Sequence, residues 1–315
     1  MRISFEDDQL AFRDAVRDLL AKECPPSVVR GAWDAPAGAL DRGVWASLDG
    51  MGVLSVLVPE VDGGLGLDEC FLVPVLEEAG RAALPHPIVE TAMVAAPLGV
   101  TGRMVTTTLG GSPPCLVDAD AVIVADDGRL LLLETIDARP VETVDRARRT
   151  GDLVYSPTEA TVLTDDPAAV AAAFDRGVLG TAAQLVGLSR AMLATTVAYV
   201  AERRQFGVPI GSFQAVKHQL ADALLAVEFA APAVARAAAT TAAGESTRTR
   251  DVSMAKALAS DAAGRTGRAA LQCHGAIGYT VEHDLHLYLK RSWALARSWG
   301  DRSFHADRVA TALDI

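Results

Sequence analysis

Two short stretches in the C-terminal half of the chain carry side chains that could bind a small molecule. An arginine guanidinium donates several hydrogen bonds in a fixed geometry that suits oxyanions, and a glycine lets the backbone approach a ligand closely. Taken singly, these residues have ordinary explanations, because an arginine at a helix end interacts with the helix dipole and a Gly-x-x-Gly segment is often only a turn. The residues are Arg203, Gln205, Phe206 and Gln214 in AERRQFGVPIGSFQ, and Gln272, Gly275 and Ala276 in LQCHGAIGY.

The cysteines and histidines do not form a recognisable metal site. The four cysteines lie far apart without a CxxC pair, so we expect reduced thiols that pack as small hydrophobic side chains. The histidines show no ligand pattern with a carboxylate on one helix face, and we predict no bound metal. The residues considered are Cys24, Cys70, Cys115, Cys273, His218, His274, His283, His286 and His305.

Composition and charge exclude several classes of protein. The net charge is −11 and the pI is about 5.0, which argues against a nucleic-acid-binding protein with a basic face. The N-terminal MRISFEDDQL lacks the apolar core of a signal peptide, and no uninterrupted apolar run reaches the roughly 18 residues of a membrane-spanning helix. We therefore expect a cytoplasmic protein without membrane insertion.

The hydrophobic pattern predicts helices on both sides of one short strand-rich segment. Residues 1–100 read as a helical domain, 101–165 as a small antiparallel sheet with Gly, Pro and Asp-Gly turns, and 166–315 as a bundle of four long helices. The predicted helices cover 5–22, 44–51, 69–83, 89–98, 168–205, 212–243, 250–276 and 282–297, with a last short helix after Ser303.

Three segments together resemble the acyl-CoA dehydrogenase family. VWASLDGMGVLSVLVPEVDGGLGLDE is similar to the PE–GGLG passage that lines one side of that family's substrate cleft. AERRQFGVPIGSFQ is similar to its R-x-F-G-x-x-I/L-x-x-F/H-Q signature, and LQCHGAIGYTVEHD to its Q-x-x-G-G-x-G-Y/F-x-x-E segment. As an ordered set these motifs are specific, and the likeness covers most of the chain. The resemblance implies a mostly α fold with an N-terminal helical domain, a reduced β-domain and a C-terminal four-helix bundle.

The resemblance also implies roles for the residues of the two stretches at 203–214 and 272–276. It implies that FAD is the cofactor and that Arg203, beside Gln205 and Phe206, binds its pyrophosphate. Gln214 would hold the adenosine half, and Gln272 with the backbone at Gly275 and Ala276 would complete that pocket. In the family these residues serve the flavin of a neighbouring subunit, so an oligomer is expected.

The sequence departs from the family in the β-domain. A full-length relative carries a T-E-P-x-x-G-S-D-like run that contacts the flavin ring and the substrate. Residues 101–164 are too short for the full domain, and GGSPPCLVDAD does not replace that run. We therefore expect the chain to supply the adenine side of a neighbour's flavin without cradling a flavin of its own.

A second departure concerns the catalytic base. Oxidation at Cα–Cβ needs a carboxylate that removes the α-proton, but the two positions where relatives carry this glutamate are Trp299 and Gly177 here. Asp301 lies two residues beyond the first position and Asp175 two before the second. Either a partner supplies the base, or Asp301 has taken over, or the fold serves a non-redox role, in that order of preference. Asp301 before Arg302 and Ser303 would also suit a helix N-cap.

These features predict a subunit of an FAD-dependent acyl-CoA dehydrogenase that introduces an α,β double bond into an acyl-CoA thioester. The expected partners are a full-length acyl-CoA dehydrogenase subunit, in a heterotetramer of two short and two full-length chains, and an electron-transfer flavoprotein. By analogy alone, the substrate is bulky or steroid-derived. The alternative is a non-catalytic scaffold or binding subunit without flavin turnover of its own.

Overall fold

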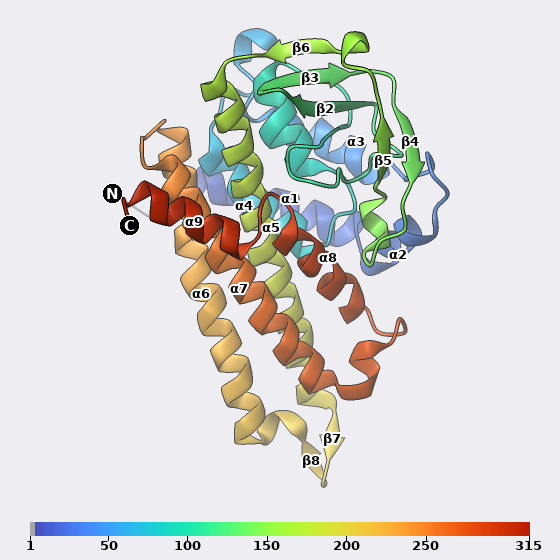
Figure 1. Ribbon diagram of the computed structural model, residues 1–315. Coiled ribbons are helices and arrows are strands. Elements are labelled where there is room, and N and C mark those ends of the chain that lie inside the picture. The colour runs from blue at the N-terminus through green and yellow to red at the C-terminus, as the bar shows by residue number, and fades with distance from the viewer. Residues whose placement is uncertain (1–3) are drawn as a thin grey trace.

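The computed structural model describes residues 4–315 and shows the predicted mostly α architecture (Figure 1). The strands between residues 105 and 164 gather at one end of the molecule, and the long helices of the C-terminal half extend from them to the opposite end, where a short hairpin at 204–209 lies. The sheet therefore lies at one end of the bundle, and the stretches at 203–214 and 272–276 lie at the opposite end.

The N-terminal part is helical, as predicted, with one helix that the sequence pattern did not reveal. The missed helix, α2, begins at Pro26, where a proline is tolerated because the first helical N–H has no partner within the helix. The predicted helix at 89–98 is a π-helix followed by a 3₁₀ turn. The elements are α1 (Asp7–Glu23), α2 (Pro26–Asp34), α3 (Gly43–Gly50), η1 (Val53–Ser55), η2 (Glu60–Asp62), α4 (Glu69–Arg81), η3 (Val89–Ala95) and η4 (Ala96–Leu98).

The strand-rich segment forms a four-stranded sheet in the order β1-β2-β3-β6 and a separate hairpin of β4 and β5. The prediction of an antiparallel sheet is wrong for β1 and β2, which pair in parallel, because the connection 108–120 crosses back before β2 begins. β2 and β3 form the expected hairpin through Asp127–Gly128, both with positive φ. The strands are β1 (Val105–Thr107), β2 (Ala121–Asp126), β3 (Arg129–Leu133), β4 (Asp137–Pro140), β5 (Gly151–Val154) and β6 (Thr161–Thr164).

The C-terminal half contains the four long helices that were predicted and a short last one. α5 runs through the centre and lies so close to α4 that a Cβ atom at Gly187 would be 1.8 Å from the backbone oxygen of Glu77. Glycine is therefore required there, because any side chain would push the two helices apart. The elements are α5 (Pro167–Glu202), β7 (Arg204–Gln205), β8 (Val208–Pro209), η7 (Ile210–Ser212), α6 (Gln214–Ala242), α7 (Arg248–His274), η8 (Gly275–Tyr279), α8 (Leu285–Arg297) and α9 (Arg302–Ala312).

Helices α5 and α6 are long and apolar enough to span a membrane by length and composition alone, but their burial differs. Of the most apolar 18-residue window, 83% is buried inside the molecule for α5 and 39% for α6. The apolar character of α5 is thus explained by its place in the core. α6 carries apolar side chains that the chain itself leaves uncovered.

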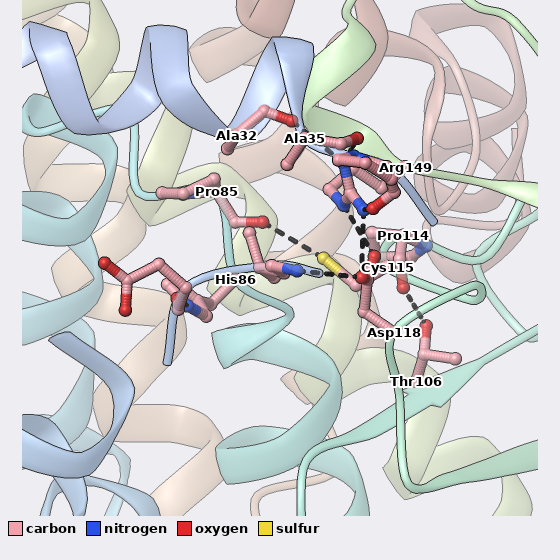
Figure 2. A network of polar contacts seen from close by, with 12 residues as sticks. Ala32, Ala35, Pro85, His86, Thr106, Pro114, Cys115, Asp118 and Arg149 are labelled. Atoms are coloured by element: carbon pink, nitrogen blue, oxygen red, sulfur yellow. Dashed lines mark hydrogen bonds and ion pairs between the residues drawn. The ribbon is translucent and has the colours of Figure 1, made fainter. Parts of the chain in front are cut away.

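A buried arginine joins the helical N-terminal part to the strand-rich segment (Figure 2). The Arg149 guanidinium donates to both carboxylate oxygens of Asp118, at 2.6 and 2.9 Å. It also donates to the carbonyl oxygens of Ala32 and Ala35 at the end of α2, at 3.0 and 2.7 Å. Because both charged side chains are almost fully buried, this pair holds the two parts in one arrangement, and removing one partner would leave an uncompensated charge.

Candidate functional site

Arg203, Gln205 and Phe206 lie on or beside a tight hairpin at the end of the bundle farthest from the sheet (Figure 1). α5 ends at Glu202, and β7 and β8 pair through a two-residue turn of Phe206 and Gly207, both with positive φ. Phe206 is 93% exposed and contacts only the edge of Phe213 among the aromatic rings, with ring centroids 6.3 Å apart. The hairpin therefore presents its side chains outward.

The remaining predicted cofactor residues are at the same end of the bundle. Gln214 is the first residue of α6, and Gln272 lies in the last turn of α7. Gly275 has φ +62° and ψ −137°, a backbone conformation that only glycine adopts easily. Ala276 follows in η8, and all these residues are exposed.

Aromatic stacking joins the two stretches. Tyr199, in the last turn of α5, stacks on His274 at the end of α7, with ring centroids 4.3 Å apart and an interplanar angle of 19°. Tyr199 also accepts the backbone N–H of Arg203 at 2.9 Å. The fold thus brings together the stretch at 203–214 and the stretch at 272–276, which are far apart in the sequence.

This arrangement fits the adenine and pyrophosphate half of a flavin dinucleotide. Within residues 4–315, Arg203 forms no ion pair, so its donors remain available for a phosphate. A Cβ atom at Gly275 would meet nothing within 4 Å, so the backbone there borders open space. Because all these residues are exposed, a dinucleotide bound there would be accessible to a neighbouring molecule.

Asp301, the candidate base on this chain, is the N-cap of α9. Its carboxylate accepts the backbone N–H of Phe304 at 3.0 Å, which lowers its pKa and keeps it ionised. The side chain is at the surface rather than in a cleft. The capping role considered from the sequence is confirmed, and the geometry gives the catalytic hypothesis for Asp301 no support.

Trp299 and Gly177, the two positions at which the resemblance places the base, are in direct contact. The indole of Trp299 is 1% exposed and packs against both Gly177 of α5 and Gly110 of the strand-rich segment. The backbone N–H of Trp299 donates to the carbonyl of Gly110 at 2.9 Å. A direct backbone hydrogen bond leaves no layer between the turn at 299 and the strand-rich segment, so no planar ring can lie between them in this arrangement.

Asp175, two residues before Gly177, is fully buried and has a structural role. Its carboxylate accepts from Arg308 at 2.7 Å, from Thr249 at 2.8 Å and from Arg248 at 2.9 Å. Two arginines and a hydroxyl on one buried carboxylate form a structural ion-pair network. It joins the start of α5 to α7 and α9.

The sequence reasoning missed one buried carboxyl beside Trp299. Burial raises the pKa of Glu90 on η3, while the positive charge of Arg148 and the indole of Trp299 oppose that rise. The adjoining cavity has a volume of about 20 Å³, room for about one water molecule and too little for a thioester. A lone acid within the apolar run IVETAMVAA was the available signal.

A larger opening lies on the outer side of Phe174. This α9 cleft, bordered by Thr108, Leu109, Phe174, Phe304 and Arg308, has a volume of about 620 Å³ and is mostly apolar. The ring of Phe174 contacts Trp299 edge-on at 5.7 Å between centroids and Phe304 at 6.0 Å. Phe174 thus borders the α9 cleft and also contacts Trp299.

The fold and these motifs define a flavoenzyme family. Residues 6–112 match the family model described as acyl-CoA dehydrogenase, N-terminal domain, and residues 168–313 match acyl-CoA dehydrogenase, C-terminal domain. The chain therefore belongs to the acyl-CoA dehydrogenase family, whose members generally depend on FAD and oxidise acyl-CoA thioesters.

Sequence similarity to known proteins extends over almost the whole chain. The chain is 33% identical over 307 residues to acyl-CoA dehydrogenase IpdE2 of Mycobacterium tuberculosis, covering 92% of each chain. It is 32% identical over 308 residues to IpdE2 of Mycolicibacterium smegmatis, covering 93% of this chain and 95% of that protein. It also matches FadE34 of Mycobacterium tuberculosis at 34% identity, over 86% of this chain but only 42% of that longer protein.

Solved structures share the fold at lower identity. A Tcur3481–Tcur3483 steroid ACAD variant has a TM-score of 0.87 at 23% identity, covering 98% of both chains. The ChsE4–ChsE5 complex from Mycobacterium tuberculosis has a TM-score of 0.85 at 22% identity, covering 100% of this chain and 99% of that one. These neighbours confirm the fold inferred from the sequence.

Proposed function

We propose that this chain is the base-lacking subunit of a two-chain, FAD-dependent acyl-CoA dehydrogenase. It completes the adenine half of a flavin whose ring and substrate are held by a full-length partner subunit. The flavin, when bound, accepts the hydride from Cβ. The observation that carries this proposal is the packing of Trp299 on Gly177 and Gly110, which removes both the base and the space for the reaction from this chain.

The chain's own contribution is to bind and orient. Arg203 is free to donate to the pyrophosphate, while Gln205 and Phe206 on the hairpin flank it. Gln214 is placed to donate to the adenosine half, and the open backbone at Gly275 admits a close approach. Since these groups all face outward, they are useful only if another chain carries the rest of the site.

The exposed face of α6 supports the association with a partner. Leu224, Leu225 and Phe229 are 44%, 55% and 72% exposed, and they lie on a helix whose other face is packed in the bundle. Contiguous exposed apolar side chains of this kind mark protein interfaces. We propose a heterotetramer of two short and two full-length chains, with electrons leaving to an electron-transfer flavoprotein.

The substrate class is drawn from the relatives. One structural neighbour is described as a steroid ACAD, and the fold similarity extends over nearly all of both chains. A bulky or steroid-derived acyl-CoA is therefore the substrate that we propose for the complex.

The test is to purify the chain alone and together with a full-length partner subunit. We expect the lone chain to be colourless and inactive, and the complex to show flavin absorbance and to reduce an artificial electron acceptor with acyl-CoA. A lone chain that is yellow and turns over would contradict the proposal. A complex whose flavin content and turnover equal those of the partner alone would instead support a scaffold role.

A further inference from the structure

A second opening, which the proposed function does not use, lies between α8 and the strand-rich segment. This α8 cleft has a volume of about 350 Å³, within the range of small-molecule sites. The strand-rich segment, which forms one side of this cleft, lies at the end of the bundle opposite the hairpin and the predicted flavin contacts. The side chains that matter at this cleft are Ser112, Arg148, Thr150, Lys290, Trp293 and Arg297.

The α8 cleft collects positive charge in a chain of net charge −11. Lys290 and Arg297 lie two turns apart on α8, and in the part of the chain that the structure describes neither forms an ion pair. Asp145, the acid at this cleft, is already paired with Arg291. The Nζ atom of Lys290 lies 4.6 Å from the centroid of the Trp33 ring, a contact that leaves its charge without a paired acid among the described residues. Lys290 and Arg297 therefore border the same concave surface without a carboxylate partner, which favours an anionic ligand.

Arg148 forms a fixed wall of the cleft. It is 7% exposed and donates to the hydroxyl of Ser298 and to the carbonyl of Ser112, both at 2.7 Å. These two contacts hold the guanidinium plane in one orientation, with the buried Glu90 behind it. A preoriented guanidinium binds a phosphate oxygen at little entropic cost.

Thr150 provides an independent indication of a ligand. Its side chain is 4% exposed, and its Oγ1 atom has no hydrogen-bond partner within the described residues. A buried hydroxyl without a partner costs about 1–3 kcal/mol. Because Thr150 borders the α8 cleft, an acceptor on a bound molecule would satisfy it.

Trp293 gives the rim of the cleft a flat apolar surface. Its side chain is 49% exposed and lies one turn before Arg297 on α8. An exposed indole beside cations can stack on a planar ring while the cations bind its charged substituent. We infer that the α8 cleft binds a nucleotide, with its phosphates on Lys290, Arg297 and Arg148 and its ring on Trp293.

The test uses the purified full-length chain and isothermal titration with ADP, inorganic phosphate and adenosine. We expect ADP to bind more tightly than either fragment, and the double variant Lys290→Gln, Arg297→Gln to weaken ADP binding by at least about tenfold, since charge-assisted contacts are lost. Thr150→Val, which keeps the shape of the side chain, should weaken ADP binding without changing the melting temperature by more than a few degrees.

Arg302→Gln is the matched control, because Arg302 is an exposed cation on α9, outside the cleft. It should leave ADP binding unchanged. Absence of ADP binding, or equal losses in the double variant and the control, would overturn the inference. Equal affinity for inorganic phosphate and ADP would overturn the assignment of a nucleotide, because the ring would then contribute nothing.

Discussion

The indole of Trp299 packs on the backbone of Gly177 so closely that a Cβ atom at residue 177 would lie 2.3 Å from Cη2 and Cζ3 of the ring. The resemblance places the catalytic glutamate of relatives at these two positions, and here the indole occupies the space that a side chain at residue 177 would need. The loss of the base and the loss of the cavity are therefore one structural change. In the proposed function, a partner subunit supplies both.

Gly177→Ala should destabilise the chain, because the new methyl group cannot coexist with the indole. We expect a net loss of about 1–2 kcal/mol, since overpacking costs about 1–3 kcal/mol and the better helix propensity of alanine returns up to about 1. Urea unfolding would measure it. In a Trp299→Leu background the same substitution should cost less, and an unchanged cost would disprove direct packing.

Gly31→Ala is the matched control for that substitution. Gly31 lies on the exposed side of α2, and a Cβ atom there would meet nothing within 4 Å. Alanine at this position should raise the free energy of unfolding by about 0.5–1 kcal/mol. Opposite signs at Gly31 and Gly177 would separate the effect of packing from that of helix propensity.

Arg203→Ala should lower the FAD content of the assembled enzyme. The affinity for FAD should fall about ten- to a hundredfold, because a charge-assisted contact of about 1.5–3 kcal/mol is lost. The fold should be intact, since Arg203 is exposed and forms no ion pair within residues 4–315. Arg302→Ala is the control, because Arg302 is an exposed cation on α9, outside the stretches at 203–214 and 272–276. Full FAD occupancy in purified Arg203→Ala complex would show that the pyrophosphate lies elsewhere.

Substitutions at Asp301 distinguish a cap from a base. Asp301→Ala should cost about 1 kcal/mol of stability through loss of the N-cap, and Asp301→Asn almost nothing, because asparagine caps equally well. Turnover of the complex with an artificial acceptor should be near normal in both. A loss of several orders of magnitude in Asp301→Asn, with FAD still bound, would make Asp301 the catalytic base.

Lys256 makes stability depend on pH. It is fully buried on α7 and donates to the carbonyls of Ala296 and Gly300 at 3.1 and 3.0 Å, and burial lowers its pKa to about 7 while Asp301 opposes this. Between pH 7 and 10 the unfolded chain thus binds more protons than the folded one, so stability rises with pH in that window.

The measurement compares the wild type with Lys256→Met by urea unfolding at pH 7 and pH 9. From pH 7 to pH 9, the free energy of unfolding of the wild type should rise by about 2 kcal/mol relative to that of the variant. The reason is that the folded lysine loses its proton in this range while the unfolded one keeps it. A difference that does not change with pH would show that Lys256 stays protonated in the folded chain.

Most helices could be predicted from the sequence because apolar periodicity and glycine or proline boundaries are local features. α2 was missed because it is short, at nine residues, and contains Gly31 after the Pro25–Pro26 pair. The parallel pairing of β1 and β2 could not be predicted, since strand direction depends on the path of the connection rather than on either strand. The boundaries of the three predicted domains remain a prediction.

The predicted flavin contacts were found through motifs that lie within short stretches. That the stretch at 203–214 meets the stretch at 272–276 follows from the stacking of Tyr199 on His274, which no local pattern encodes. The contact between Trp299 and Gly177, and the gathering of Arg148 with Lys290 and Arg297, likewise arise only when distant segments pack. Chemistry carried by one segment can be predicted, whereas chemistry assembled between segments needs the fold.

The Arg149 network has a consequence for the order in which the chain folds. The carbonyl groups of Ala32 and Ala35 receive their donors from a residue more than a hundred positions later in the sequence. During synthesis, the carbonyl groups at the end of α2 therefore lack these hydrogen bonds until nearly half of the chain has left the ribosome. A fragment of residues 1–100 should accordingly be digested rapidly by protease, and a fragment of residues 1–165 more slowly, since only the longer one contains both Arg149 and Asp118.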